Sequence, residues 1–184
     1  MILTGEQIRE EVEAKRIVID PFSQRKLEPN SYGFHLGTEF LVYEEETLDI
    51  KKQLTCKSFK IPESGFILLP NRLYLSQTYE TLGSDHYAQT LHCNRSTSTL
   101  GMWIHYSAPL GHTGAIIPWT LEILVSHPVI VYPYMPIGKI AFWENIGDIV
   151  DYAGRYLNSK KVIESRIHRD CHPGRPAKDM EGES

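Results

Sequence analysis

A single acid stands in an otherwise apolar run in the second half of the chain. Glu122 lies within Thr120-Leu121-Glu122-Ile123-Leu124-Val125, which has the β-branched and aliphatic composition of a strand. An acid in such a strand either faces solvent or works as a reactive group inside a cavity, because acids in unusual surroundings concentrate at active sites. The run alone leaves both interpretations open.

A cluster of one Arg and several hydroxyl residues precedes this acid. It reads Cys93-Asn94-Arg95-Ser96-Thr97-Ser98-Thr99-Leu100-Gly101, so Arg95 lies 27 positions before Glu122. A guanidinium presents a planar fork of N–H donors that matches phosphate oxygens, and nearby hydroxyls fill the remaining acceptor sites. Together the acid and the cluster indicate hydrolytic chemistry on a nucleotide. The alternative is a solvent-facing acid and an ordinary polar loop.

The element most clearly predicted from local signals is a helix at the N-terminus. Thr4 is a suitable N-cap and Gln7, three residues on, completes a capping box. Ile8 and Val12 then mark one apolar side, which predicts a helix over residues 4–15. No second helical pattern of convincing length follows.

Short β-rich runs, separated by Gly, Pro and Asn, make up most of the remaining chain. This pattern is typical of a β-sandwich or barrel. The runs cover residues 34–36, 39–43, 65–69, 73–78, 102–106, 115–117, 119–125, 129–132 and 139–143. The strands in the second half must therefore position both Glu122 and the Arg95 cluster.

Composition narrows the class of protein. A length of 184 residues suggests one domain, and 41% hydrophobic with 23% charged residues is ordinary for a soluble protein. The net charge of −4 argues against binding to a nucleic acid polymer. The three cysteines form no CxxC pair, and no run is long and apolar enough for a membrane span or signal peptide. We predict a cytoplasmic protein with no membrane partner and a flexible tail over residues 169–184.

A series of short motifs follows in a fixed order along the chain. They are Lys15-Arg16-Ile17-Val18-Ile19, Pro29-Asn30-Ser31-Tyr32 through Leu36-Gly37, Arg95-Ser96-Thr97 before Leu100-Gly101, His105-Tyr106-Ser107-Ala108 with Glu122 fourteen residues later, Ile137-Gly138-Lys139-Ile140-Ala141-Phe142, and finally Tyr152, Arg155-Tyr156 and Ser165-Arg166-Ile167. In this order they resemble the dCTP deaminase branch of the dUTPase-like trimeric fold over residues 1–168. The resemblance implies a mainly β, distorted β-barrel (β-clip) with a short N-terminal helix, assembled as a homotrimer.

The same resemblance implies hydrolytic deamination of a cytosine deoxynucleotide, dCTP to dUTP and ammonia. Glu122 would be the general acid/base, with Ser96 beside it. The implied substrate and phosphate contacts are Arg95, Thr97, His105, Ser107, Ala108, Tyr152, Arg155, Tyr156 and Arg166. Mg²⁺ would be bound through the triphosphate. The zinc-deaminase signature H-x-E…P-C-x-x-C is absent, so no zinc cofactor is predicted.

Several positions depart from the family's pattern. His112 stands where the family has an Asp in the loop before the Glu122 strand, and the segment after Arg95 lacks a second Arg. Asn94, Gly33, Leu110 and Ser159 replace the family's Gly, Asp, Arg and Gln. A dUTP diphosphatase, which uses that loop Asp, a bifunctional deaminase-diphosphatase, and a catalytically degenerate nucleotide-binding protein therefore remain alternatives. By its alternation with Trp103, His105 is also interpretable as a hydrogen-bonded core histidine.

Overall fold

The N-terminal helix forms behind its predicted Thr4 cap, but the Gln7 side chain donates to Glu11 Oε1 at 2.9 Å and does not complete the predicted capping box. The computed structural model describes residues 1–157 and 159–171. Helix α1 spans Gly5–Glu13, and the Thr4 side chain accepts a hydrogen bond from the Gln7 N–H at 3.3 Å. Ile8 is fully buried beneath it. No helix in the described residues is both long and apolar enough to cross a membrane.

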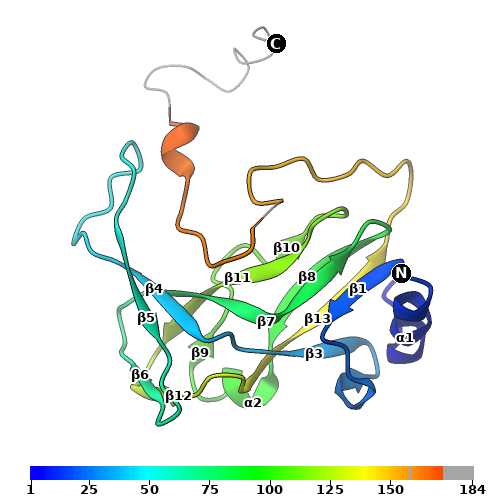
Figure 1. The fold of residues 1–184 in the computed structure, drawn as a ribbon, viewed down its shortest axis with the longest axis horizontal. Coiled ribbons are helices and arrows are strands. Elements are labelled where there is room, and N and C mark those ends of the chain that lie inside the picture. The colour runs from blue at the N-terminus through cyan, green and yellow to red at the C-terminus, as the bar shows by residue number, and fades with distance from the viewer. Residues whose placement is uncertain (158, 172–184) are drawn as a thin grey trace, which may run out of the picture.

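Strands build the rest of the domain, which is mainly β as predicted (Figure 1). A six-stranded sheet has the order β5-β4-β7-β11-β9, with β1 also paired to β7. A five-stranded sheet has the order β10-β8-β13-β3-β2, and β12 pairs with β6. The strands are Ile17–Asp20 (β1), Leu27–Glu28 (β2), Ser31–His35 (β3), Glu39–Tyr43 (β4), Cys56–Lys60 (β5), Phe66–Leu68 (β6), Tyr74–Ser84 (β7), Tyr87–Cys93 (β8), Met102–Trp103 (β9), Leu110–Gly111 (β10), Ile116–Val125 (β11), Val129–Val131 (β12) and Pro136–Glu144 (β13).

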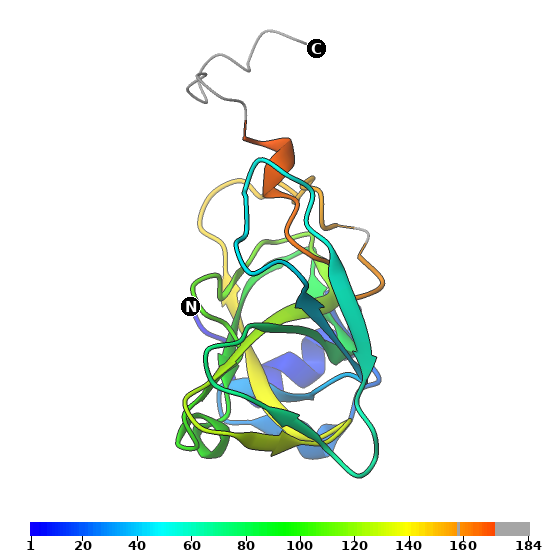
Figure 2. The ribbon, with the colours of Figure 1, turned by 90° about the vertical axis from the view of Figure 1, so that its left-hand side faces the viewer.

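Large side chains from both sheets fill one core between them. Tyr32, Phe34, Phe40 and Phe142 are fully buried and Tyr74 nearly so. Figure 2 shows the strands curving around this core, with the N-terminal helix behind them, and Figure 1 shows that helix at one end of the domain. Three short helices complete the described chain: Arg95–Ser98 (α2) and the 3₁₀ helices Gln24–Lys26 (η1) and Ile167–Arg169 (η2).

The segment that follows β13 returns across the end of the barrel near β10 and β11 (Figure 1, yellow to red). Two backbone donors attach it to its own chain. The Tyr152 N–H donates to the Thr113 carbonyl at 2.9 Å, and the Ser165 N–H donates to the Tyr43 hydroxyl at 2.9 Å. Of the predicted flexible tail, residues 172–184 lie outside the described residues. The predicted domain boundary at residue 168 stays a prediction.

A fully buried carboxylate in β7 gives a test of the barrel's stability. The Glu80 carboxylate accepts hydrogen bonds from Lys26 Nζ at 2.8 Å and from the His35 backbone N–H at 2.9 Å, and lies 2.6 Å from His35 Nδ1. Without the Glu80 carboxylate, the Lys26 ammonium and the His35 N–H would lose their hydrogen-bond acceptor inside the protein. We expect Glu80→Ala to lower the free energy of unfolding by about 3 kcal/mol in urea titrations. A loss under about 1 kcal/mol, typical of surface ion pairs, would contradict this assignment.

Candidate active site

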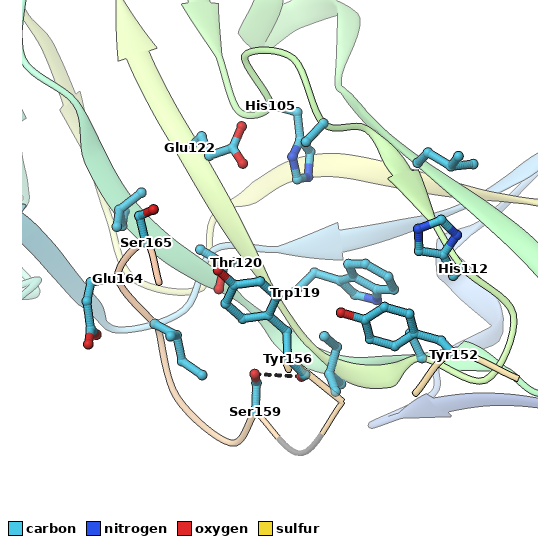
Figure 3. A pocket seen from close by; sticks show the side chains of 16 residues that line it. His105, His112, Trp119, Thr120, Glu122, Tyr152, Tyr156, Ser159, Glu164 and Ser165 are labelled. Atoms are coloured by element: carbon cyan, nitrogen blue, oxygen red, sulfur yellow. Dashed lines mark hydrogen bonds between the residues drawn. The ribbon is translucent and has the colours of Figure 1, made fainter. Parts of the chain in front are cut away.

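A cavity of about 340 Å³ lies at the end of the barrel under the returning C-terminal segment. Its walls come from β11, from the segment between β9 and β11, and from residues 152–157 and 159–165 (Figure 3). Pockets that hold small ligands fall in the range of about 300–1,000 Å³. Its lining includes Glu122, His105, Ala108, His112, Trp119, Thr120, Tyr152, Tyr156, Ser159, Glu164 and Ser165.

Glu122 is held in this cavity by the backbone on either side. It pairs with Leu75 of β7, and its N–H donates to the Ile104 carbonyl at 2.8 Å. Its Oε2 accepts a hydrogen bond from the Tyr106 N–H at 3.2 Å. The side chain is half-buried, and Figure 3 shows its carboxylate directed toward His105. The structure thus places this acid in a cavity wall rather than on an open strand face, and its catalytic role stays a prediction.

His105 lies beside Glu122 with both ring nitrogens buried. Neither nitrogen has a hydrogen-bond partner within the described chain, so these residues do not supply the bonds expected of a hydrogen-bonded core histidine. Burial, together with a smaller effect of the charge of His92, lowers the pKa of His105 to about 4. At neutral pH the imidazole is therefore uncharged and offers one donor and one acceptor. Such a ring suits a polar ligand that enters the cavity.

The same burial predicts how stability depends on pH. The His105 pKa is below the ordinary value of 6.5, so as pH falls from 6.5 toward 4 the unfolded chain takes up a proton that the folded chain does not. The folded state should lose about 2–3 kcal/mol from this residue between pH 7 and pH 4.5. We expect His105→Asn to remove that part of the loss in urea titrations at the two pH values. If the variant and the parent showed the same pH dependence, His105 would have to be protonated at pH 4.5 in the folded state as well as in the unfolded chain.

An aromatic wall lies across the cavity from these two residues. The Trp119 indole N–H donates to the Leu82 carbonyl at 2.9 Å, and His112 stacks on Tyr152 with ring centroids 5.4 Å apart and an interplanar angle of 16°. Trp119 and Thr120 were not predicted as site residues. Thr120 is two positions from Glu122, and side chains two apart share a face of a strand, so this spacing could have identified it. A register shift between Pro118 and Thr120 adds Trp119 to the same side.

The predicted phosphate cluster lies outside this cavity. Arg95, Ser96 and Thr97 form helix α2, where Arg95 and Ser96 are exposed and Thr97 is buried. Ser107, also predicted, is exposed and does not line the cavity, whereas Ala108 does. Within one chain, the structure therefore does not bring the Arg95 cluster to Glu122.

The predicted C-terminal contacts are divided between two places. Tyr152 and Tyr156 line the cavity. Arg155 instead donates to the Arg166 carbonyl at 2.8 Å and pairs with the Asp170 carboxylate, which raises the Arg155 pKa. The Arg166 backbone N–H donates to the Tyr156 hydroxyl at 3.4 Å. The Arg155 guanidinium and the Arg166 backbone thus lie close to the cavity's C-terminal wall.

Residues 1–157 and 159–171 contain no group of three or more His, Cys, Asp or Glu side chains that could hold a metal ion.

Comparison with known proteins assigns the chain to a family. A family model described as dCTP deaminase-like matches residues 2–145. A Clostridium acetobutylicum protein named "dCTP deaminase, dUMP-forming" is 40% identical over 171 residues, which are 92% of this chain and 98% of that protein. A Rhodopirellula baltica protein named "dCTP deaminase" is 38% identical over 171 residues, which are 92% of this chain and 86% of the relative.

A solved structure supports the fold independently of close sequence similarity. The crystal structure of 2'-deoxycytidine 5'-triphosphate deaminase from Agrobacterium tumefaciens matches with a TM-score of 0.62 at 17% identity. The match covers 78% of this chain and 48% of that one, so this chain spans about half the length of the solved protein. The predicted dUTPase-like barrel is confirmed. The family match and the relatives place this chain, an enzyme, in the dCTP deaminase-like family.

Proposed function

We propose that this enzyme converts dCTP and water to dUTP and ammonia. The observation that carries the proposal is Glu122, an acid held by the Tyr106 N–H in the wall of a cavity, in a chain whose relatives are named dCTP deaminases. The proposal also keeps the prediction of a cytoplasmic enzyme.

The reaction needs one group that can both accept and donate a proton. Water adds to C4 of the cytosine ring while the Glu122 carboxylate takes one of its protons. The protonated Glu122 gives that proton to the ring nitrogen N3. Glu122 then takes the proton of the new C4 hydroxyl and passes it to the amino group, so the C4–N bond breaks, ammonia leaves and the C4 carbonyl forms. A single positioned carboxylate suffices for this exchange. The uncharged ring of His105, beside Glu122, supplies hydrogen bonds to the base or the water.

We infer that a neighbouring chain of a homotrimer completes the site. Arg95 and Ser96 are exposed on α2 and lie outside the cavity of their own chain. In a closed ring of identical subunits, such a surface repeats at each contact and can face the Glu122 cavity of the next subunit. Arg95, with Arg155 and Arg166 of the C-terminal segment, would then bind the triphosphate. Arg155 would exchange the Asp170 carboxylate for phosphate oxygens.

A panel of nucleotides tests the proposal directly. The protein is incubated with dCTP, CTP, dCMP and dUTP, and both ammonia and pyrophosphate are measured. Deamination of dCTP releases ammonia and leaves dUTP. Binding of dCTP without release of either product would instead identify a nucleotide-binding protein that has lost turnover.

A second candidate function is favoured by the names of the relatives. Those from Clostridium acetobutylicum and Cytophaga hutchinsonii are named as dUMP-forming. Formation of dUMP from dCTP consumes two waters and releases both ammonia and pyrophosphate. The dUTPase-like fold uses a loop Asp for the second hydrolysis, and this chain has His112 at that position. Equal amounts of the two products in the panel would establish the bifunctional reaction, and pyrophosphate released from dUTP alone would indicate a diphosphatase.

Metal dependence gives a further prediction. We expect activity to survive a zinc-selective chelator but to fall when Mg²⁺ is removed, because a triphosphate recruits Mg²⁺ through its own oxygens. Activity is measured after dialysis against each chelator and after adding back each metal. Stoichiometric zinc in the purified protein, with activity restored by zinc alone, would contradict the glutamate mechanism.

A further inference from the structure

The loop that carries His112 is anchored on both sides of that residue. On one side, Gly111 packs so closely on Trp119 that a Cβ there would lie 2.6 Å from the indole ring. On the other side, the Gly114 N–H donates to the Ser84 carbonyl at 2.7 Å, and the Thr113 hydroxyl accepts a hydrogen bond from Asn145 Nδ2 at 2.9 Å. The loop is thus a fixed platform with His112 exposed on its surface.

Tyr152 contacts this platform at two points. Its backbone N–H donates to the Thr113 carbonyl at 2.9 Å, and its ring stacks on His112 with an interplanar angle of 16°. The approach leaves no room for a larger residue at Gly114, where a Cβ would lie 2.9 Å from the Tyr152 nitrogen. Gly114 also has a φ of +91°, which favours glycine. Loop and segment are therefore fitted to each other.

The position of Tyr152 sets how the following segment covers the cavity. Residues 152–165 supply the wall formed by Tyr156, Ser159 and Ser165, and the far end is attached where the Ser165 N–H meets the Tyr43 hydroxyl. Because it is attached at both ends, we call this segment, residues 152–157 and 159–165, the strap. If the contact at Tyr152 loosens, the strap keeps only its far attachment.

We propose that His112 is a positioning residue that holds the strap over the cavity by stacking on Tyr152, and that it takes no part in proton transfer. Figure 3 shows His112 and Glu122 at different ends of the cavity, with His112 against the Tyr152 ring. Stacking requires a flat ring and not a titrating nitrogen, so a phenyl ring at position 112 should serve equally well. This inference rests on the proposed deamination only for its kinetic readout.

The proposal predicts opposite outcomes for two substitutions at one position. His112→Phe keeps the ring and removes all acid–base capacity, so KM and kcat should stay within about twofold of the parent. Its pH profile of kcat/KM should coincide with that of the parent. His112→Ala removes the ring, so KM for dCTP should rise about 3–10-fold while kcat changes little. His86→Ala removes an exposed histidine whose ring pairs with the adjacent Asp85 carboxylate, and it serves as the matched control.

A double-substitution cycle tests whether the effect passes through Tyr152. Tyr152→Ala and His112→Ala should each raise KM, and the double variant should be no worse than Tyr152→Ala alone, because both remove the same contact. Fully multiplicative effects would overturn the proposal. A fall in kcat of about 10²-fold or more in His112→Phe, which is the loss expected on removing a general base, would also overturn the proposal.

Hydrogen exchange of the Tyr152 amide gives a readout that needs no turnover. This amide should exchange faster in His112→Ala than in the parent, His112→Phe or His86→Ala, because the strap opens more often. Equal exchange in all four proteins would overturn the proposal. If no nucleotide is deaminated but exchange follows this order, the proposed function fails and the positioning role of His112 stands.

Discussion

Glu122→Gln should reduce ammonia release from dCTP by about 10²–10⁴-fold while leaving nucleotide binding nearly unchanged. The amide fills the same space, and its oxygen can still accept the hydrogen bond that the Tyr106 N–H donates to the Glu122 carboxylate at 3.2 Å. It cannot take a proton from water, and the described cavity offers His105 as an uncharged neighbour with a pKa of about 4. The loss should therefore appear in kcat rather than in the dissociation constant for dCTP.

The measurement pairs single-turnover ammonia release with calorimetric titration of dCTP. Glu39→Gln is a suitable control, since Glu39 is also a strand acid, on β4, and does not line the cavity. It should retain the activity of the parent. Activity of Glu122→Gln within a few-fold of the parent would remove Glu122 from the proposed mechanism, whatever the identity of the nucleotide.

Much of the fold was predictable because its signals are local. The Thr4 cap and the spacing of Ile8 and Val12 predicted α1, and the β-rich composition of residues 39–43 predicted β4 with the observed bounds. Strand β8 was missed because a polar residue faces inward there. Gln89 is fully buried, and its side-chain amide donates to the Ser84 and Tyr87 carbonyls. Such compensation depends on tertiary contacts and leaves no trace in hydrophobic periodicity.

The candidate site was predictable only in part, and for a physical reason. His105, Tyr152 and Tyr156 were predicted by motif resemblance, and the structure gathers them around Glu122. Trp119 was missed because alternation assigns it to the face opposite Thr120, and only the register shift in β11 turns both toward the cavity. Spacing along the chain likewise could not show that Arg95 lies away from Glu122, since neither residue's position depends on local sequence alone.

The separation of Arg95 from the Glu122 cavity leads to the second prediction, which concerns assembly. Arg95→Ala should weaken dCTP binding, because hydrogen bonds to charged groups contribute about 1.5–3 kcal/mol. At dCTP concentrations well below the parent KM, this variant and Glu122→Gln should each be nearly inactive. If sites form between neighbouring chains, a trimer that contains both variants can assemble some sites from an intact Glu122 and an intact Arg95.

Equal amounts of the two variants, unfolded together and refolded, should therefore recover about one quarter of the parent activity, the fraction expected from random mixing in a closed ring. Light scattering must show a trimer for the parent and for the mixture.

A matched mixture of parent chains with the double variant Glu122→Gln/Arg95→Ala distinguishes the arrangements further. It should retain about one quarter of the parent activity if sites are shared and about one half if each chain builds its own. No recovery in the first mixture, or a monomer in solution, would contradict a shared site. The phosphates would then have to be bound within one chain, by Arg155 and Arg166 once Asp170 has released Arg155.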